Sequence, residues 1–539
     1  MKKQMKTIGT TLSIILATTS LLAACSKEEA SSTPKATSSS APAVQAAKYP
    51  IASAGTISSW EEINPNITSI VPNLGESAFG KQLEKETGVK VKYTHPADGQ
   101  KKEQFNLLIA SNNLTDVIEY DWNKEYPGGP EKAIADKMII PLNELIDKFA
   151  PNLKKLLQQD KELDKMLKTD SGKYYVFPMI RPENGLVFRG PILRKDWLDE
   201  LSLPVPTTID EWYTVLKAFK EKKGATAPFT AQYSTGSELN IQDAFIGAFK
   251  TANRYYIDDQ GKVKYGPIDP QFKEVLTLFR KWYAEGLIDK DFALNTDSKS
   301  LDNKMLSNAS GSTVGLLSVI GRWMDTAKKK EPNYHLVAAP YPTLKKGERA
   351  FIGQRDFKYN PLASKAVTTA AKDPELAVKW LDYAYSEKGA TLFNFGIEGE
   401  SFNLVSGVPT WSDKITKDPK LNLQQMVSQY TKPNGPFLGD SRKNFNTYPE
   451  QNDAMKIWAE TDAVKHVMPT FITPTVEESK EIAKLNTAIS SYKEEMFIKF
   501  VMGKEPIDKF DEYVKRIQEM GSDKVLKIYQ DAFDRYNKR

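Results

Sequence analysis

The chain has 539 residues, with 74 Lys and Arg against 69 Asp and Glu, and a formal net charge of +5. This length suffices for two or three domains, and the absence of a basic block argues against nucleic-acid binding. The three histidines lie far apart, and no G-x-S-x-G, G-x-x-x-x-G-K-[ST] or C-x-x-C motif is present, so nothing indicates an enzyme. A glycosidase-type pair of carboxylates is spatial rather than sequential and stays open.

The amino terminus, residues 1–24, is typical of an export signal. Lys2, Lys3 and Lys6 precede the mostly apolar stretch 8–22, which is shorter than the roughly 20 residues that a helix needs to span a bilayer. Small residues and then Cys25, the only cysteine, follow it. The pattern resembles the lipobox of bacterial lipoproteins, which implies cleavage before Cys25 and attachment of a lipid such as palmitate there. The alternative is a chance thiol inside a signal peptide.

Residues 25–48 are predicted to form a flexible tether, because Ser, Thr, Ala, Pro and Lys dominate them and almost nothing can be buried. Without a further cysteine the body that follows cannot contain a disulfide, so a large core must stabilise it. Residues 1–24 hold three lysines and no acid, which leaves a net charge of +2 for the rest. No later apolar run is long enough to cross a membrane.

The next part of the chain alternates helical and strand patterns. Helices are expected over 77–88, 101–110 and 133–138 and from Pro141 onward, and strands over 89–93, 116–122 and 174–180. Further helices are expected over 193–203, 212–223, 272–285, 376–385 and 475–502, and a strand over 313–320. Thr208 with Glu211, and Thr475 with Glu478, match capping boxes. The amphipathic stretch 507–536 is expected to cover one lobe. Such alternation predicts an α/β layer architecture.

Ligands of open α/β sheets bind beyond the carboxyl ends of the strands, and this rule selects two tryptophans. Trp122 comes directly after the strand residues 116–120, at the start of a loop rich in Gly and Pro, and Trp323 follows the strand 313–320. An aromatic face can bury the apolar face of a sugar ring, while charged side chains pair with its hydroxyl groups. An ordinary core or rim aromatic is an equally good interpretation of either tryptophan alone.

Several other residues are candidates for ligand contact. For each of the charged ones alone, a solvated surface charge is the more common role. Four charged candidates lie near strand ends: Glu119, Asp121, Arg322 and Arg355. Two further candidates, Phe395 and Glu398, lie in a glycine-containing loop, and two more, Tyr175 and Arg189, lie beside an expected crossover between lobes.

Motifs along the chain resemble the family 1 extracellular solute-binding proteins of ABC importers. They are KETGV at 85–89, ASNNLTDVI at 110–118, LRKDWLDEL at 193–201, DPE at 373–375, YSEKG at 385–389 and FGIEGE at 395–400. The nearest group is the large LplA/YtcQ-like lipoproteins, which are related to alginate-oligosaccharide-binding proteins. The resemblance implies a two-lobe, periplasmic-binding-protein-like (type II) α/β fold with a hinge. The lobes would be an N-lobe of 49–180 and 352–415 and a C-lobe of 181–351 and 416–539.

The resemblance also assigns roles to residues. Trp122 and Trp323 match tryptophans that line the sugar site in related proteins, and Phe471 falls near another aromatic of that site. Alginate-binding relatives carry a calcium loop after the helix that corresponds to 212–219. Residues 220–229 read KEKKGATAPF and lack the clustered oxygen ligands that calcium needs, so no metal is expected there.

The sequence therefore predicts a lipid-anchored receptor on the outer face of the cytoplasmic membrane. It would be a monomer that captures an oligosaccharide for the membrane-spanning subunits of an ABC permease, without cofactor, metal, nucleic acid or covalent chemistry. One alternative is a surface-anchored carbohydrate-active enzyme, which would need two carboxylates facing one cleft. A second is a peptide receptor of the same transporter type, whose site would offer strand edges rather than stacked aromatics.

Overall fold

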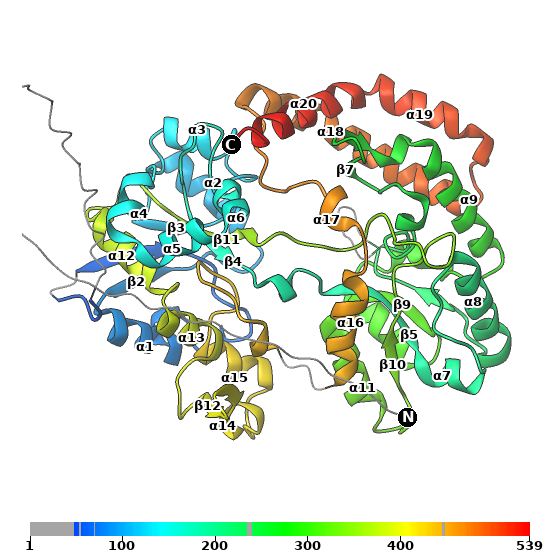
Figure 1. The fold of residues 1–539 in the computed structure, drawn as a ribbon, viewed down its shortest axis with the longest axis horizontal. Coiled ribbons are helices and arrows are strands. Elements are labelled where there is room, and N and C mark those ends of the chain that lie inside the picture. Colours follow the sequence, from blue (N-terminus) through cyan, green and yellow to red (C-terminus); the bar gives the residue numbers. More distant parts are fainter. Residues whose placement is uncertain (1–47, 53–54, 69, 234–239, 445–447) are drawn as a thin grey trace, which may run out of the picture. The chain divides into compact units, whose positions relative to one another are not determined.

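The computed structural model describes residues 48–52, 55–68, 70–233, 240–444 and 448–539. The predicted export signal, Cys25 and the tether up to residue 47 lie outside the described residues. The described part contains a five-stranded and a four-stranded β-sheet, each with helices packed around it, and two smaller two-stranded sheets (Figure 1).

Five strands form the first sheet, in the order β2-β1-β3-β11-β4. β1 (Thr56–Trp60) is parallel to β2 (Lys90–Thr94) and β3 (Val117–Glu119), whereas β11 (Tyr359–Val367) is antiparallel to β3 and to β4 (Phe177–Ile180). One buried apolar cluster joins this sheet to its helices. These helices are α1 (Ala78–Thr87), α2 (Lys101–Ser111), α3 (Gly129–Ala135), α4 (Asn143–Phe149), α5 (Pro151–Gln159), α6 (Lys161–Met166), α12 (Pro374–Tyr383) and α13 (Glu387–Phe395). We call this body the first lobe.

The second sheet has the order β10-β5-β9-β6. β5 (Arg189–Arg194) is antiparallel to β10 (Leu336–Ala338) and β9 (Ser312–Leu316), and β6 (Phe229–Thr230) is parallel to β9. Two buried clusters surround it and define the second lobe. Its elements include α7 (Lys195–Glu200), α8 (Ile209–Lys223), α9 (Pro270–Ala284), α10 (Ser298–Leu306), α11 (Leu317–Ala327), α16 (Pro449–Ala459), α17 (Ala463–His466), α18 (Val476–Val501) and α19 (Phe510–Glu519). The hairpin of β7 (Tyr255–Ile257) and β8 (Val263–Tyr265) contributes buried residues to the clusters of both lobes.

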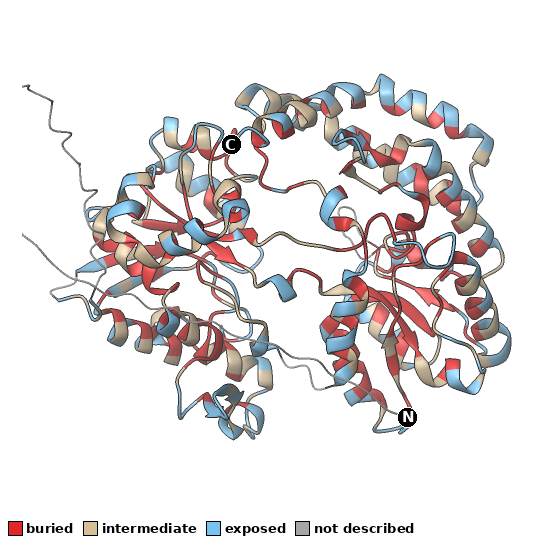
Figure 2. Cartoon of the chain, viewed as in Figure 1, coloured by how far each residue is buried: buried red, intermediate tan, exposed pale blue. Residues whose placement is uncertain are grey.

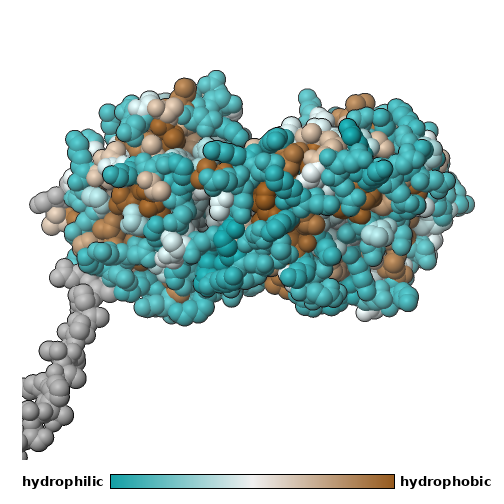
Figure 3. Space-filling view, turned by 90° about the horizontal axis from the view of Figure 1, so that it is seen from above, coloured by the Kyte–Doolittle hydropathy of each residue, from teal (hydrophilic) through white to brown (hydrophobic). Residues whose placement is uncertain are grey.

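Buried residues concentrate in the two larger sheets and on the helix faces turned toward them, and exposed residues on the outer turns of the helices (Figure 2). The face seen in Figure 3 is mostly hydrophilic with scattered apolar patches. None of the helices in the described ranges is long and apolar enough to span a bilayer.

Residues 416–539 do not all pack in the second lobe. The hairpin of β12 (Phe402–Val405) and β13 (Val408–Trp411) leads into α14 (Asp413–Thr416) and α15 (Leu423–Tyr430), and Phe437 beyond them joins the core of the first lobe. α20 (Ser522–Tyr536) is shared, because Val525 lies in a second-lobe cluster and Phe533 in the first-lobe cluster. This packing differs from the predicted boundary at residue 416 and from a carboxy-terminal stretch confined to one lobe.

Among the passages of chain that connect the lobes, 181–188 and 353–358 run side by side. The backbone N–H of Arg181 donates to the carbonyl of Lys358 at 2.8 Å, and that of Asp356 donates to the carbonyl of Leu186 at 2.9 Å. An ion pair of 2.9 Å between the side chains of Arg181 and Asp356 joins the passages again. These two passages therefore form a paired connection between the lobes.

Local sequence signals account for many element ends, but not for all. Both predicted capping boxes are present, at the starts of α8 and α18. The predicted strand over 313–320 is wrong beyond residue 316, where α11 begins. Its buried residues Leu317, Ile320, Trp323, Met324 and Ala327 recur at helical spacing. The predicted helix over 193–203 begins two residues later, because Leu193 and Arg194 end β5.

Candidate functional site

Two adjoining cavities lie beyond one edge of the first sheet. The first chamber has a volume of about 620 Å³ and the second about 690 Å³, and each is within the range of roughly 300–1,000 Å³ usual for ligand sites. They share the wall residues Asp121, Arg181, Asn360 and Leu362. First-lobe residues line the first chamber, among them those of the segments 62–67, 119–121 and 428–434, whereas residues of both lobes line the second.

The strand register explains why the shared residues meet. Asp121 comes just after β3, and Arg181 comes directly after β4. β11 lies between these two strands, with Lys365 opposite Glu119 on one side and Tyr359 opposite Ile180 on the other. The amino-terminal part of β11 therefore lies beside the carboxyl ends of both neighbours, which is where open α/β sheets bind ligands.

The two chambers differ in their remaining walls. In the first, Lys101 pairs with Glu62 at 3.2 Å, and its ammonium lies 5.2 Å from the ring centroid of Tyr120. In the second, the rings of Tyr255 and Tyr529 come within 4.5 Å of each other, centroid to centroid. Each chamber therefore combines apolar ring surface with groups that can donate or accept hydrogen bonds, which is the usual composition of a small-molecule site.

Asp121 is the acidic group common to both chambers. Its carboxylate accepts the backbone N–H groups of Asn123 at 3.1 Å and Lys124 at 3.2 Å. Burial raises the pKa of this carboxyl above its ordinary value, against the opposing effect of those two N–H groups. No side-chain cation is paired with Asp121 among the described ion pairs, so its oxygens can accept hydrogen bonds from a ligand.

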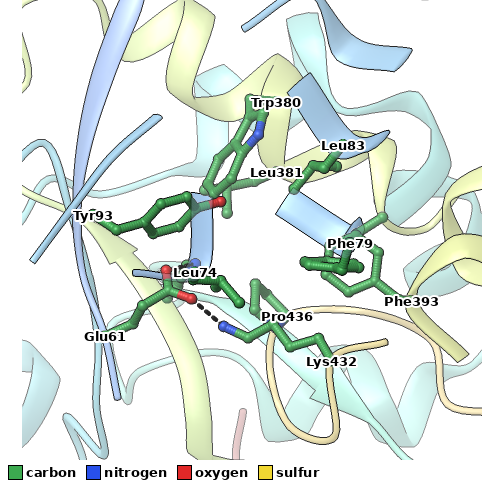
Figure 4. Close-up of a pocket in the computed structure, with 12 residues that line it drawn as sticks. Glu61, Leu74, Phe79, Leu83, Tyr93, Trp380, Leu381, Phe393, Lys432 and Pro436 are labelled. Atoms are coloured by element: carbon green, nitrogen blue, oxygen red, sulfur yellow. Dashed lines mark hydrogen bonds and ion pairs between the residues drawn. The ribbon is translucent and has the colours of Figure 1, made fainter. Parts of the chain in front are cut away.

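A buried cluster of four charges lies under the first chamber. Lys432 contacts Glu61 and lies 2.8 Å from Glu119, while Lys365 contacts Glu61 and lies 3.6 Å from Glu119. Figure 4 shows Glu61 and Lys432 facing each other beside Tyr93 and Leu74. Although burial alone would raise the pKa of Glu61, the two ammonium groups hold it below its usual range. Burial would lower the pKa of Lys432, but Glu119 and Glu61 raise it above its usual range.

Ion pairs also fix the connecting passages beside the second chamber. Arg355 pairs with Glu183 at 2.8 Å, and Lys358 pairs with Asp160 at 2.7 Å. Because Arg181, Arg355 and Asp356 also line the chamber, a ligand there would touch the groups that join the two passages.

The predicted tryptophans do not line either chamber. Trp122 is 1% exposed and packs on Phe105 and Tyr126, with ring centroids 5.3 and 5.9 Å away. Trp323 is fully buried in α11, where its indole N–H donates to Asp302 at 2.8 Å. In this structure neither ring offers a face to a ligand, because both fill core volume between helices and sheet.

Of the other predicted site residues, the structure brings only some together. Glu119 and Asp121 line the first chamber, and Asp121 and Arg355 line the second. The remaining ones have other surroundings: Arg322 of α11 pairs with Asp302 of α10, Phe395 is buried beside Phe402, Glu398 lies in an exposed turn, Phe471 packs on Phe357 and Tyr536, Tyr175 donates to Asn123 at 2.7 Å, and Arg189 begins β5.

Sequence reasoning missed Arg181, Asn360 and Leu362. Arg181 could have been found, because it directly follows the predicted strand 174–180 and so obeys the same strand-end rule. Asn360 and Leu362 flank Pro361, and proline inside a strand pattern indicates a bulge or an edge; that signal was available but does not point to a ligand.

No metal centre emerges from the described ranges, in which no group of three or more His, Cys, Asp or Glu side chains is placed to hold an ion. At the carboxyl end of α8, Lys223 pairs with Glu200 and Lys220 donates to the carbonyl of Glu285. Lysine side chains and a short loop do not fit a calcium ion, which takes six to eight oxygen ligands.

Comparisons with known proteins give a consistent result. Residues 65–391 match a family described as bacterial extracellular solute-binding protein. The chain is 27% identical over 349 residues to lipoprotein LipO of Bacillus subtilis (strain 168), which covers 62% of this chain and 66% of LipO. It is 24% identical to the fructooligosaccharide ABC transporter substrate-binding protein FusA of Streptococcus pneumoniae serotype 4, which covers 98% of both. The crystal structure of alginate-binding protein AlgQ2 without calcium ion is similar with a TM-score of 0.68 and 25% identity, over 91% of this chain and 100% of AlgQ2.

Proposed function

This chain belongs to the bacterial extracellular solute-binding proteins, and from that premise we propose that it captures an oligosaccharide in the two chambers and delivers it to the permease of an ABC importer. The observation that carries the proposal is the pair of adjoining chambers, one walled by the first lobe and the other by both lobes. Together they form a site longer than a single sugar ring requires. FusA is named for fructooligosaccharides and AlgQ2 for alginate, which supports an oligosaccharide as the solute.

Binding would act through the hinge rather than through covalent chemistry. A ligand that contacts both walls of the second chamber favours the conformation in which those walls are closest. Closure around the passages 181–188 and 353–358 would then present a lobe surface that the permease recognises. The proposed receptor is a monomer and needs no cofactor.

The carboxylate of Asp121 gives a direct test of the site. Asp121→Asn is expected to weaken binding of the cognate oligosaccharide about tenfold or more, because hydrogen bonds to a charged group contribute about 1.5–3 kcal/mol each. Affinity should also fall as the pH is lowered, since the raised pKa of Asp121 lets the acceptor oxygens become protonated earlier than those of a free carboxyl. The Asn variant should lose this pH dependence.

The measurement is isothermal titration calorimetry of the chain from Ser26 onward, against a panel of neutral and uronic-acid oligosaccharides and of peptides. Asp98→Asn is the matched control, because Asp98 is exposed on a turn and lines neither chamber. Binding of peptides but of no glycan would contradict the oligosaccharide assignment while leaving the receptor assignment intact. Cleavage of a bound glycan, followed by chromatography of the same samples, would favour the enzyme alternative.

We also propose that Cys25 carries a lipid that holds the protein on the outer face of the cytoplasmic membrane. The name of LipO, a lipoprotein, and the order of residues 1–25 support this anchor. Cys25→Ala is expected to abolish incorporation of labelled palmitate and to move most of the protein from the membrane fraction to the medium. Retention of the variant in the membrane fraction would point to a different anchor.

A further inference from the structure

β11 contains an irregularity at the junction of the two chambers. Asn360 lies opposite Met179 of β4, and Lys365 lies opposite Phe177. The chain thus advances five residues along β11 while it advances two along β4, so three extra residues protrude between the two pairs. Bulges of this kind re-aim side chains and are frequent beside functional sites.

Hydrogen bonds hold the bulge in place. The backbone N–H of Leu362 donates to the side-chain carbonyl of Asn360 at 3.2 Å, and the hydroxyl of Ser364 donates to the backbone carbonyl of Asn360 at 3.0 Å. Pro361 has no backbone N–H, so no ladder hydrogen bond from this residue is left unmade where the strand protrudes. The conformation is therefore built into the strand rather than caused by a frayed end.

The bulge exposes a single apolar side chain. Leu362 is 61% exposed, whereas every other residue of β11 is buried. It lines both chambers, together with Asn360, Asp121 and Arg181. An aliphatic side chain that projects into a cavity is unfavourable unless a ligand removes its surface from water.

We infer that Leu362 is a ligand-binding residue, on which one sugar ring packs with its apolar C–H face while Asp121, Asn360 and Arg181 surround the ring edge. This inference rests on the proposed oligosaccharide function and names the apolar contact that the buried Trp122 and Trp323 do not provide. It also places that ring at the junction, so that the ligand extends from it into both chambers. The ligand is therefore longer than one sugar unit.

The test compares affinities of Leu362 variants for whichever oligosaccharide the unaltered chain binds. Leu362→Ala is expected to weaken binding about tenfold, and Leu362→Asn at least as much, because burial of a leucine side chain is lost or replaced by burial of an amide. Leu362→Met should restore most of the affinity. Leu107→Ala is the matched control, since Leu107 is 68% exposed on α2 and lines neither chamber.

Urea unfolding of the same variants separates a binding role from a structural one. The midpoint for Leu362→Ala should stay at that of the unaltered chain, because truncation of an exposed side chain leaves no cavity. Calorimetric titration with oligosaccharides of increasing length should show affinity rising from one unit to at least three. Unchanged affinity in Leu362→Ala, with a chain that does bind oligosaccharides, overturns the inference. A chain that binds no oligosaccharide overturns the proposed function instead.

Discussion

Lys432→Met is expected to lower the free energy of unfolding by about 3–5 kcal/mol, as is usual when one partner of a buried ion pair is removed. The variant would leave Glu61 and Glu119 buried with only Lys365 between them. Both carboxylates have left water, so their Coulombic attraction to Lys432 is what offsets the cost of desolvating them. Urea denaturation followed by circular dichroism would measure the change.

The controls use charges elsewhere and within the cluster. Lys414→Met removes an exposed lysine that lies 2.9 Å from Glu400 and should change stability by less than about 1 kcal/mol. The double variant Glu61→Gln with Lys432→Met removes one charge of each sign, so it should be more stable than the sum of the two single effects predicts. Equal losses in Lys432→Met and Lys414→Met would show that the buried cluster has no special contribution.

The same cluster predicts how stability depends on pH. The pKa of Glu61 is depressed in the folded state, so its contribution is present above the unfolded value of about 4.3 and is lost as the pH falls below it. The pKa of Lys432 is raised, so its contribution is present below about 10.4 and is lost as the pH rises beyond it. Glu61→Gln should therefore flatten the acid side of the stability profile.

Local signals in the sequence predict the elements better than they predict the site. Thr208 with Glu211 and Thr475 with Glu478 specify helix starts within four residues of chain, and both are found. The strand-end rule likewise led to Asp121, because a strand and the residue after it are neighbours in sequence. These features depend on short stretches that can be interpreted alone.

Other features depend on residues that only the fold brings together. Glu61, Glu119, Lys365 and Lys432 come from four separate segments, and nothing local marks any of them as a member of a buried cluster. The protrusion of Leu362 depends on the register between β11 and β4, which the sequence of β11 does not contain. The apolar run 313–320 before Trp323 fits a buried strand and a buried helix equally well. The sequence alone therefore does not show that its second half begins a helix that contains Trp323.

Trp323→Ala is expected to lower the free energy of unfolding by about 3–5 kcal/mol, the usual cost of truncating a large buried aromatic side chain. The ring is fully buried, and its indole N–H donates to Asp302, which also binds Arg322. The substitution therefore leaves a cavity between α11 and its neighbours and removes one hydrogen bond from Asp302. Trp323→Phe keeps most of the ring volume and should cost less.

Ligand affinity separates the role of Trp323 as a buried core residue from the sugar-binding role that the family resemblance predicts. Under conditions where Trp323→Ala is still folded, its affinity for the cognate oligosaccharide should equal that of the unaltered chain, because the ring lines neither chamber. Trp122 is less suitable, since it adjoins Asp121, and a cavity there would disturb the carboxylate. Val464→Ala, at an exposed position, controls for truncation itself and should change stability by no more than about 0.5 kcal/mol. A folded Trp323→Ala variant that loses affinity tenfold would mean that the second lobe presents this ring to the ligand in another conformation.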